Sequence, residues 1–416
     1  MSSYIIKGGK KLYGEVKLQG AKNAALPIMA ACVLNNTENI LYNVPKIKDV
    51  SIMIKILRSI GCKVIENGDC LIIDSSTINS VEVSEQLVRK MRSSIMVMGA
   101  LLSKHNETRF SYPGGCDIGL RPIDIHLKGL RALGAEITEE HGYIVCTCSS
   151  LKGTNILLDY PSVGATENIM LAAVYAEGVT SISNAAKEPE IVDLQEFLNH
   201  MGARVYGAGT NTIYVEGVKH LSKAEYKIMS DRIVAGTYLC AVNTTGGKVF
   251  IQDGTLDNIK AVYYKLIETG CEIKQYSDGL MVKSNGNIQA IDTLITLPYP
   301  GFPTDLQPVF TAMLTYAKGS SIINETIFES RYKFATQLIR MGANIKIEGR
   351  LAIITGMDHL SSATLYSPDL RGGAALCVAA LRADGESRLE DVEYIERGYE
   401  NFVDNFTKIG ASIYYR

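Results

Sequence analysis

A cysteine stands at the tip of a flexible turn in the segment PGGCDIGLR. Cys116 follows a proline and two glycines, and Arg121 comes five residues later, where a helical pattern begins. A nearby arginine and a helix N-terminus both lower the pKa of a thiol, whereas Asp117 acts in the opposite direction. Because the turn exposes the side chain, we interpret Cys116 as a reactive thiol; the alternative is a small apolar residue in a loop.

Polar residues stand where several apolar helices are expected to begin. Lys22, Arg92 and Arg371 occupy such starts, and another start is expected near Thr166 and Glu167. The free N–H groups and the dipole of a helix start favour an anion, and a basic side chain strengthens that preference. One such residue alone would be a solvated charge beside a cap, but three in corresponding places predict an anion site.

Three further arginines precede a second class of helix, which is amphipathic. Arg121 and Arg397 each lie 13 residues before a glycine that ends such a helix, and Arg331 lies close to the corresponding place. The planar guanidinium group suits bidentate contacts with phosphate and carboxylate. Together with the basic helix starts, these arginines predict a cleft that binds one or two small polyanions.

A single acid accompanies these cations. Asp305 lies in LPYPGFPTDLQPVF, a turn rich in Pro and Gly that leads into a helix. It is either an N-cap, which would stabilise the helix by about 1 kcal/mol, or a carboxylate that nearby cations keep ionised, which could act as a base toward a hydroxyl group. Thr304 could cap the helix equally well, so both hypotheses stay open.

The composition argues against several classes of function. The 416 residues carry a net charge of −2, which gives no reason to expect nucleic acid or an anionic membrane as a partner, and no apolar run is long enough to span a bilayer. The nine cysteines are scattered and the start has no signal-peptide pattern, so we expect reduced thiols and a cytoplasmic location. The spacing of His and Cys does not suit a metal. GxGxxG and GxxxxGK[ST] are absent, and SVGAT resembles a phosphate loop only loosely. We therefore expect neither a metal nor a cofactor.

The elements that must position these residues recur six times. Each copy contains a buried helix rich in Ala and Met, then an amphipathic helix that ends in a marker glycine followed by a strand, as in GLRALGAEI and LIRMGANI. The marker glycines fall 68 to 73 residues apart, at the helix-end position that tolerates a positive φ, and they are Gly61, Gly134, Gly202, Gly270, Gly342 and Gly410. The unit predicts the order β-α-β-α-β-β. Three units make a domain of normal size, so we expect two similar domains with a ligand in the cleft between them.

Six motifs in register carry a family resemblance along the whole chain. They are LQGAKNAALP, PGGCDIGLRPIDIHL, YPSVGATENIMLAA, GFPTDLQP, DLRGGAAL and IERGYENF. In these segments the chain resembles the UDP-N-acetylglucosamine 1-carboxyvinyltransferases, which belong to the enolpyruvyl transferases. The resemblance implies an inside-out α/β barrel with two domains of three repeats each. One domain would span residues 21–229, and the other would combine residues 1–20 with 230–416.

The resemblance also implies a reaction. The enolpyruvyl group of phosphoenolpyruvate would move to the 3′-hydroxyl of UDP-N-acetylglucosamine by addition and elimination through a tetrahedral ketal, with release of phosphate. This step opens peptidoglycan synthesis, and with it cell-wall formation. Cys116 would be the general acid at C3 and the thiol that fosfomycin alkylates, and Asp305 would take the proton of the sugar hydroxyl. Lys22, Arg121 and Arg397 would hold phosphoenolpyruvate.

The remaining site residues follow from the same matches. Those that resemble contacts to the nucleotide sugar are Asn23, Arg92, the segment Arg121, Pro122, Ile123, Asp124 and Ile125, the loop Ser162, Val163 and Gly164, and Ile327. Those that resemble residues lining the cleft are Arg331, Asp369 and Arg371. The chain departs from the pattern at Tyr160 and Pro161, where some members have a lysine that helps to hold the nucleotide.

Three alternatives remain. One is the sister enzyme that acts on shikimate 3-phosphate, which lacks the Pro-Gly-Gly-Cys loop. Another is an RNA 3′-phosphate cyclase, which the absence of a nucleotidyl-accepting histidine near a large basic face argues against. The third is a non-catalytic protein that binds UDP-N-acetylglucosamine without releasing phosphate. We expect a monomer or a weak oligomer.

Overall fold

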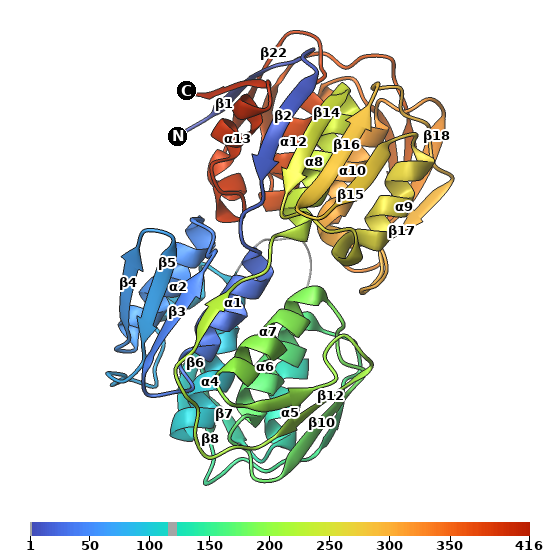
Figure 1. Cartoon of the computed structure of the whole chain (residues 1–416). Helices are drawn as coiled ribbons and strands as arrows, with labels where there is room; N and C mark the ends of the chain where they lie inside the picture. Colours follow the sequence, from blue (N-terminus) through green and yellow to red (C-terminus); the bar gives the residue numbers. More distant parts are fainter. Residues whose placement is uncertain (1, 115–122) are drawn as a thin grey trace. The chain divides into compact units, whose positions relative to one another are not determined.

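The computed structural model describes residues 2–114 and 123–416 of the chain (Figure 1). These residues divide into two compact units. The C-unit consists of residues 2–19 and 230–416, and the N-unit consists of residues 20–114 and 123–229. The two units are described separately below.

Three buried helices pack against one another in the N-unit. They are α1 (Lys22–Ala31), α4 (Met96–His105) and α6 (Val163–Ala173). Their alanine, methionine and leucine side chains are inaccessible to solvent on nearly every face, which explains why these segments are apolar all round. Amphipathic helices with one buried face accompany them, namely α2 (Lys48–Ser59), α5 (Asp124–Ala132) and α7 (Pro189–His200). Two short helical turns precede α4, α3 (Glu85–Val88) and η1 (Arg92–Ile95).

Three sheets complete the N-unit. In spatial order they are β13 (Glu225–Lys227), β3 (Glu38–Tyr42), β5 (Cys70–Asp74) and β4 (Lys63–Asn67); β6 (Glu107–Ser111), β8 (Tyr143–Thr147) and β7 (Glu136–Glu140); and β11 (Arg204–Tyr206), β12 (Thr212–Glu216), β10 (Val179–Ser183) and β9 (Asn155–Leu157). Their side chains alternate between buried and exposed, so each sheet has an inner and an outer face.

The C-unit repeats this plan. Its buried helices are α8 (Arg232–Thr245), α10 (Gln307–Leu314) and α12 (Leu370–Ala380), and they too contact one another. Its outer helices and turns are η2 (Asp257–Ile259), α9 (Lys260–Glu268), η3 (Thr304–Leu306), η4 (Arg331–Phe334), α11 (Ala335–Arg340), η5 (Val392–Arg397) and α13 (Phe402–Lys408).

The sheets of the C-unit have four strands each. They are β15 (Glu272–Tyr276), β16 (Gly279–Ser284), β14 (Gly247–Gln252) and β2 (Leu12–Lys17); β17 (Thr293–Ile295), β18 (Ser320–Asn324), β20 (Leu351–Thr355) and β19 (Asn344–Glu348); and β21 (Thr364–Tyr366), β22 (Glu386–Glu390), β1 (Tyr4–Lys7) and β23 (Ser412–Tyr415). With the helices inside and the sheets outside, both units have the predicted inside-out α/β architecture.

The six marker glycines close six identical helix ends. All six have a positive φ, between +89° and +102°. In each repeat the residue after the glycine donates its N–H to the carbonyl five positions earlier, as Cys62 does to Leu57 (3.0 Å) and Ala411 to Phe406 (3.0 Å). This is the Schellman arrangement, which a residue with a Cβ adopts only with strain. The prediction from the glycine spacing is confirmed.

The predicted strand order holds with three exceptions. The second repeat has only an isolated parallel bridge, Glu82 to Arg109, where the others have a first strand. The last repeat ends with β23 alone, and β1 from the start of the chain takes the missing place between β22 and β23. Finally, β2 leads into α1 of the N-unit but pairs in parallel with β14, whereas β13 leads into α8 of the C-unit but pairs in parallel with β3. The chain therefore exchanges one strand between its two units.

Candidate active site

Two aspartates cap buried helices of the C-unit. The Asp231 carboxylate accepts the N–H groups of Ile233 (2.8 Å) and Val234 (3.0 Å) at the start of α8. Asp369 accepts those of Arg371 (2.9 Å) and Gly372 (3.0 Å) at the start of α12. Both acids are buried and satisfy N–H groups that have no partner inside their helices. Asp369 thereby fixes the backbone from which the Arg371 side chain extends.

Asp305, near the start of α10, pairs with arginine side chains. One carboxylate oxygen accepts from Nη2 of Arg331 (2.9 Å) and the other from Nη2 of Arg371 (3.0 Å). The two arginines are 2% and 4% exposed, whereas Asp305 is 28% exposed. Of the residues that the structure describes, none caps η3 with its side chain. The N-cap positions of η3 and α10 are Pro303 and Leu306 rather than Asp305, and the Asp305 carboxylate lies between two buried guanidinium groups.

Neighbouring groups keep Arg371 charged and orient both arginines of this cluster. Burial lowers the pKa of the Arg371 guanidinium, but Asp305, Tyr399 and Asp231 raise it by more, so the pKa lies above its ordinary value and Arg371 stays protonated. The guanidinium carbon lies 5.5 Å from the centre of the Tyr399 ring, within reach of a cation–π contact. Arg331 also donates to the carbonyl of Thr304 (3.1 Å). The Asp305 carboxylate is therefore partly open to solvent while two buried guanidinium groups fix its orientation.

A buried acid that the sequence analysis missed supports this cluster. Glu325 follows β18 directly and accepts the hydroxyl of Thr304 (2.9 Å), the residue before Asp305. It also accepts the N–H groups of Ile327 (2.8 Å) and Phe328 (3.1 Å). Glu325 thus fixes both the turn that carries Asp305 and the segment that carries Ile327. The only signal in the sequence was a single acid within the apolar stretch IINETIF.

In the N-unit, Lys22 is held by an acid from another helix. Its Nζ lies 2.7 Å from Oδ2 of Asp49, and the two side chains are 12% and 2% exposed. Lys22 is the first residue of α1 and Asp49 belongs to the first turn of α2. The sequence alone did not indicate Asp49, because 26 residues lie between it and Lys22. The adjacent Asn23 is half-buried on α1.

The starts of α4, α5 and α6 lie side by side. Ser162 caps α6 by accepting the N–H of Ala165 (3.3 Å), so this helix begins before the predicted start at Thr166 and Glu167, which instead lie inside it. A Cβ on Gly164 would lie 3.2 Å from both the His126 ring of α5 and the Met96 side chain of α4. The loop Ser162 to Gly164 is therefore packed against the segment that holds Ile123, Asp124 and Ile125, and against the helix that follows Arg92 in η1.

Two predicted residues of the C-unit remain to be placed. Arg397 is the last residue of η5, which contacts α12. Ile327 lies in the loop held by Glu325. By contrast, Cys116, Arg121 and Pro122 lie outside the described residues, so their roles stay predictions.

Seven of the eight other cysteines, all except Cys70, are poor candidates for a reactive thiol. All are free, and six of them are buried. Burial raises the pKa of all seven. The pKa reaches about 12 for Cys62 and Cys146, and it is also raised for the half-buried Cys148. A raised pKa lowers the thiolate fraction and hence the reactivity. These thiols do not compete with the prediction for Cys116.

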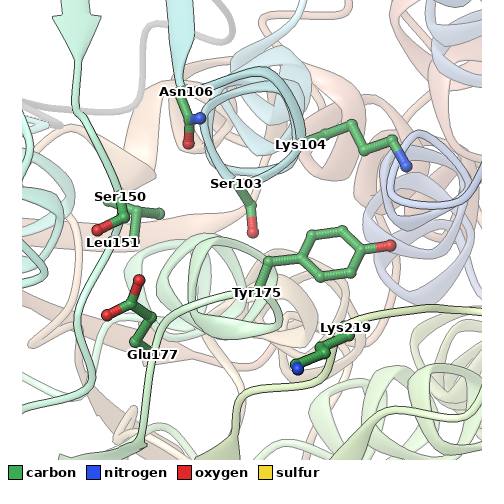
Figure 2. A pocket seen from close by; sticks show the side chains of 8 residues that line it. All are labelled: Ser103, Lys104, Asn106, Ser150, Leu151, Tyr175, Glu177 and Lys219. Atoms are coloured by element: carbon green, nitrogen blue, oxygen red, sulfur yellow. The ribbon is translucent and has the colours of Figure 1, made fainter.

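A hollow of about 280 Å³ opens at the other end of the buried helices of the N-unit (Figure 2). It is lined by Ser103, Lys104, Asn106, Ser150, Leu151, Tyr175, Glu177 and Lys219. Lys104 lies in the last turn of α4, where a cation is stabilised by the helix dipole, and its Nζ is 5.4 Å from the centre of the Tyr175 ring. None of the predicted site residues lines this hollow.

Two searches of the described part of the chain gave negative results. No group of three or more His, Cys, Asp or Glu side chains there could hold a metal ion. None of its helices is long and apolar enough to cross a membrane.

Comparisons with known proteins decide the family. The family model described as EPSP synthase (3-phosphoshikimate 1-carboxyvinyltransferase) matches residues 6–406. The chain is 52% identical over 413 residues to UDP-N-acetylglucosamine 1-carboxyvinyltransferase 2 of Caldanaerobacter subterraneus subsp. tengcongensis, with 99% of each chain covered. It belongs to the UDP-N-acetylglucosamine 1-carboxyvinyltransferases, within the wider EPSP synthase family. A relative of this enzyme family from Symbiobacterium thermophilum is 51% identical, with 99% of this chain and 94% of that protein covered.

Solved structures confirm the fold of this enolpyruvyl transferase. The enolpyruvyl transferase NikO from Streptomyces tendae superposes with a TM-score of 0.90 at 22% identity, covering 100% of this chain and 98% of that one. EPSP synthase from Acinetobacter baumannii gives a TM-score of 0.78 at 18% identity, with both chains fully covered. At such identities the likeness concerns the architecture alone.

Proposed function

We propose that the chain transfers the enolpyruvyl group of phosphoenolpyruvate to the 3′-hydroxyl of UDP-N-acetylglucosamine and releases phosphate. The observation that carries the proposal is the similarity, along nearly the whole length, to enzymes named for this reaction. The match to the sister enzyme that uses shikimate 3-phosphate is far weaker, at 18% identity. The location that suits such a peptidoglycan enzyme is the cytoplasm, where phosphoenolpyruvate is made.

The chemistry needs one base and one acid. In the addition step, the sugar hydroxyl oxygen bonds to C2 of phosphoenolpyruvate while C3 gains a proton. In the elimination step, C3 loses a proton and the bond between C2 and the phosphate oxygen breaks. We assign the hydroxyl proton to Asp305, whose ionised and partly exposed carboxylate suits a base, and the proton at C3 to Cys116.

Basic side chains would bind the phosphate and carboxylate of phosphoenolpyruvate. We assign this binding to Lys22, Arg121 and Arg397. Asp49 orients Lys22, so the ammonium group is already in a fixed place before the ligand binds. Arg331 and Arg371, with Asp369 behind Arg371, orient Asp305.

The nucleotide sugar would bind along the helix starts of the N-unit. N–H groups at a helix start attract anions such as a diphosphate. We assign this role to Asn23, Arg92, residues 121–125 and residues 162–164, and we assign a further contact to Ile327. Because Tyr160 and Pro161 stand where some family members have a lysine, the backbone of the Ser162 loop would carry more of this binding.

A phosphate-release assay tests the proposal. The protein is incubated with phosphoenolpyruvate and either UDP-N-acetylglucosamine or shikimate 3-phosphate. We expect release only with the nucleotide sugar. Release only with shikimate 3-phosphate would contradict the proposal in favour of the sister activity. Binding of the nucleotide sugar without any release would identify a non-catalytic binding protein.

A second experiment addresses the thiol. We expect Cys116→Ser to lose most of the activity and to form no adduct with fosfomycin by mass spectrometry. The matched control is Cys148→Ser, which removes a half-buried thiol of the N-unit whose pKa burial raises. It should retain both the activity and the adduct. An adduct on another cysteine of the Cys116→Ser protein would contradict the assignment.

A further inference from the structure

The chain leaves the C-unit immediately after Gln19 and returns to it at residue 230. In the C-unit, the carbonyl of Gln19 accepts the N–H of Asp231 (2.9 Å), the residue that caps α8. In the N-unit, the N–H of Ala21 donates to the carbonyl of Met229 (2.8 Å). Two backbone hydrogen bonds thus join the two passages of the chain to each other, and Gln19 is the last residue of the first passage on the C-unit side.

The Gln19 side chain reaches a segment that is almost 380 residues away in the sequence. Its Nε2 donates to the carbonyl of Gly398 (3.1 Å), and its Oε1 accepts the N–H of Glu400 (2.7 Å). These partners fix the orientation of the amide, because a carbonyl only accepts and a backbone N–H only donates. Gln19 therefore holds both sides of Tyr399, two residues after Arg397.

The segment that Gln19 holds has little other freedom. The N–H groups of Gly398 and Tyr399 both donate to the carbonyl of Ile395 (3.0 Å each). The Tyr399 hydroxyl lies 2.8 Å from Oγ1 of Thr237 on α8. The Tyr399 ring also carries the cation–π contact with the guanidinium of Arg371 described above. The amide of Gln19 adds hydrogen bonds to the carbonyl of Gly398 and the N–H of Glu400.

We propose that Gln19 is a positioning residue that sets the place of Arg397 through the backbone of residues 398–400. The proposal rests on the proposed function, in which Arg397 binds phosphoenolpyruvate. Lys22, another of the three assigned cations, follows Gln19 by three residues in the sequence. The segment from Gln19 to Lys22 would thus supply the cation Lys22 and, through Gln19, fix the backbone beside Arg397. Sequence patterns could not show this, because a glutamine between a strand and a helix is an ordinary surface residue.

The test is Gln19→Glu, which keeps the acceptor for the N–H of Glu400 but places a second acceptor against the carbonyl of Gly398. The loss of one hydrogen bond together with a repulsive contact corresponds to about a tenfold change in a binding constant. We expect KM for phosphoenolpyruvate to rise about tenfold and KM for UDP-N-acetylglucosamine to change less than threefold. Gln19→Met, which removes both hydrogen bonds without adding charge, should give the same pattern if the glutamate variant does not fold.

Gln275 provides a matched control in the same unit. Its Oε1 accepts the N–H of Leu256 (2.9 Å), and its Nε2 donates to the carbonyls of Gly254 (3.2 Å) and Gly279 (3.0 Å). Gln275→Glu therefore imposes the same chemical change on a loop without assigned site residues. We expect it to leave both KM values unchanged. If both variants raise KM for phosphoenolpyruvate equally, or neither does, the positioning role of Gln19 is wrong.

Arg397→Lys separates this inference from the proposed function. If Arg397→Lys leaves KM for phosphoenolpyruvate unchanged, the assigned role of Arg397 fails, and the inference fails with it. If that KM rises, Gln19→Glu is added in the Arg397→Lys background. We expect less than a threefold further increase, because two residues that act through one contact are not additive. A full tenfold further increase would mean that Gln19 acts by another route.

Discussion

The two units build their buried helices from the same repeat but begin them with different chemistry. In the C-unit, α8, the turn before α10, and α12 start with Asp231, Asp305 and Asp369. In the N-unit, α1, the turn before α4, and α6 start with Lys22, Arg92 and Ser162. Acids at the C-unit starts already satisfy N–H groups or guanidinium groups. The N-unit starts therefore keep more of their preference for an anion.

Two other buried acids of the N-unit, Glu167 and Asp193, lie farther along their helices and have raised pKa values. Burial, and then Glu190 and Glu188, raise the pKa of Glu167 on α6 well above its ordinary value. Burial raises the pKa of Asp193 on α7 to about 6 against the effect of its hydrogen bonds. In the C-unit, by contrast, Asp305 has two arginines as partners. From this difference we propose that the base of the reaction lies in the C-unit at Asp305, and that the helix starts of the N-unit bind the nucleotide sugar.

The largest expected effect is on turnover at Asp305. Asp305→Asn keeps the shape of the side chain but removes the base and its charge. Loss of a positioned general base lowers kcat by about 100- to 10,000-fold, while the dissociation constant of UDP-N-acetylglucosamine should stay within a few fold. The measurements are steady-state phosphate release and calorimetric binding. Asp257→Asn, at an exposed acid paired with Lys260, is the control. Turnover near normal in Asp305→Asn would reduce Asp305 to a structural residue.

The same cluster predicts a ranking of stabilities. Asp305→Asn leaves two buried like charges without their counter-ion, and breaking a buried ion pair in this way costs about 3–5 kcal/mol of unfolding free energy. Arg331→Met leaves a neutral pair, Asp305 with Arg371, and should cost less, about 1–3 kcal/mol for the lost hydrogen bonds. Urea unfolding of both variants tests the ranking. An equal loss in both would mean that solvent, rather than Asp305, compensates the arginine charges.

The acids without a cationic partner predict a pH dependence. The ordinary pKa of Asp193 is 3.8, and in the folded protein it is about 6, so the folded state binds its proton more tightly. The stability that this residue contributes is therefore highest at low pH and is lost as the pH rises from about 4 to about 6, by about 3 kcal/mol. Asp193→Asn should remove this loss, although Tyr226 and Met229 both donate to the carboxylate, so some stability is lost at every pH.

The measurement is the difference in unfolding free energy between the native protein and Asp193→Asn at several pH values. We expect the variant to gain stability relative to the native protein between pH 4 and pH 6. Comparison with the native protein cancels the contribution of Glu167, which has the same sign. A difference that does not change with pH would show that Asp193 titrates at its ordinary pKa.

The sequence predicted what repeats and missed what pairs across the fold. The glycine spacing gave the six repeats and the backbone conformation at Gly61 and its equivalents, because those depend on neighbouring residues alone. It missed Asp49 and Glu325, whose partners lie far along the chain or in an unremarkable turn. It left Asp305 undecided between cap and base, since only the fold brings Arg331 and Arg371 to it. The start of α6 was placed too late because Ser162, rather than Thr166, caps it.

The smallest expected effect concerns the Ser162 cap, which can be compared with the Asp369 cap of the other unit. Ser162→Ala and Asp369→Ala each remove an N-cap, and each should cost about 1 kcal/mol of unfolding free energy. Their effects on the substrates should differ, because Ser162 begins a helix whose N–H groups we assign to the nucleotide sugar, whereas Asp369 fixes the backbone of Arg371. We expect Ser162→Ala to raise KM for UDP-N-acetylglucosamine a few fold with kcat unchanged, and Asp369→Ala to lower kcat with less effect on that KM. Identical kinetic changes in the two variants would mean that the helix starts of both units serve the same purpose, and the proposal that N-unit helix starts bind the nucleotide sugar while the C-unit orients the base Asp305 would have to be abandoned.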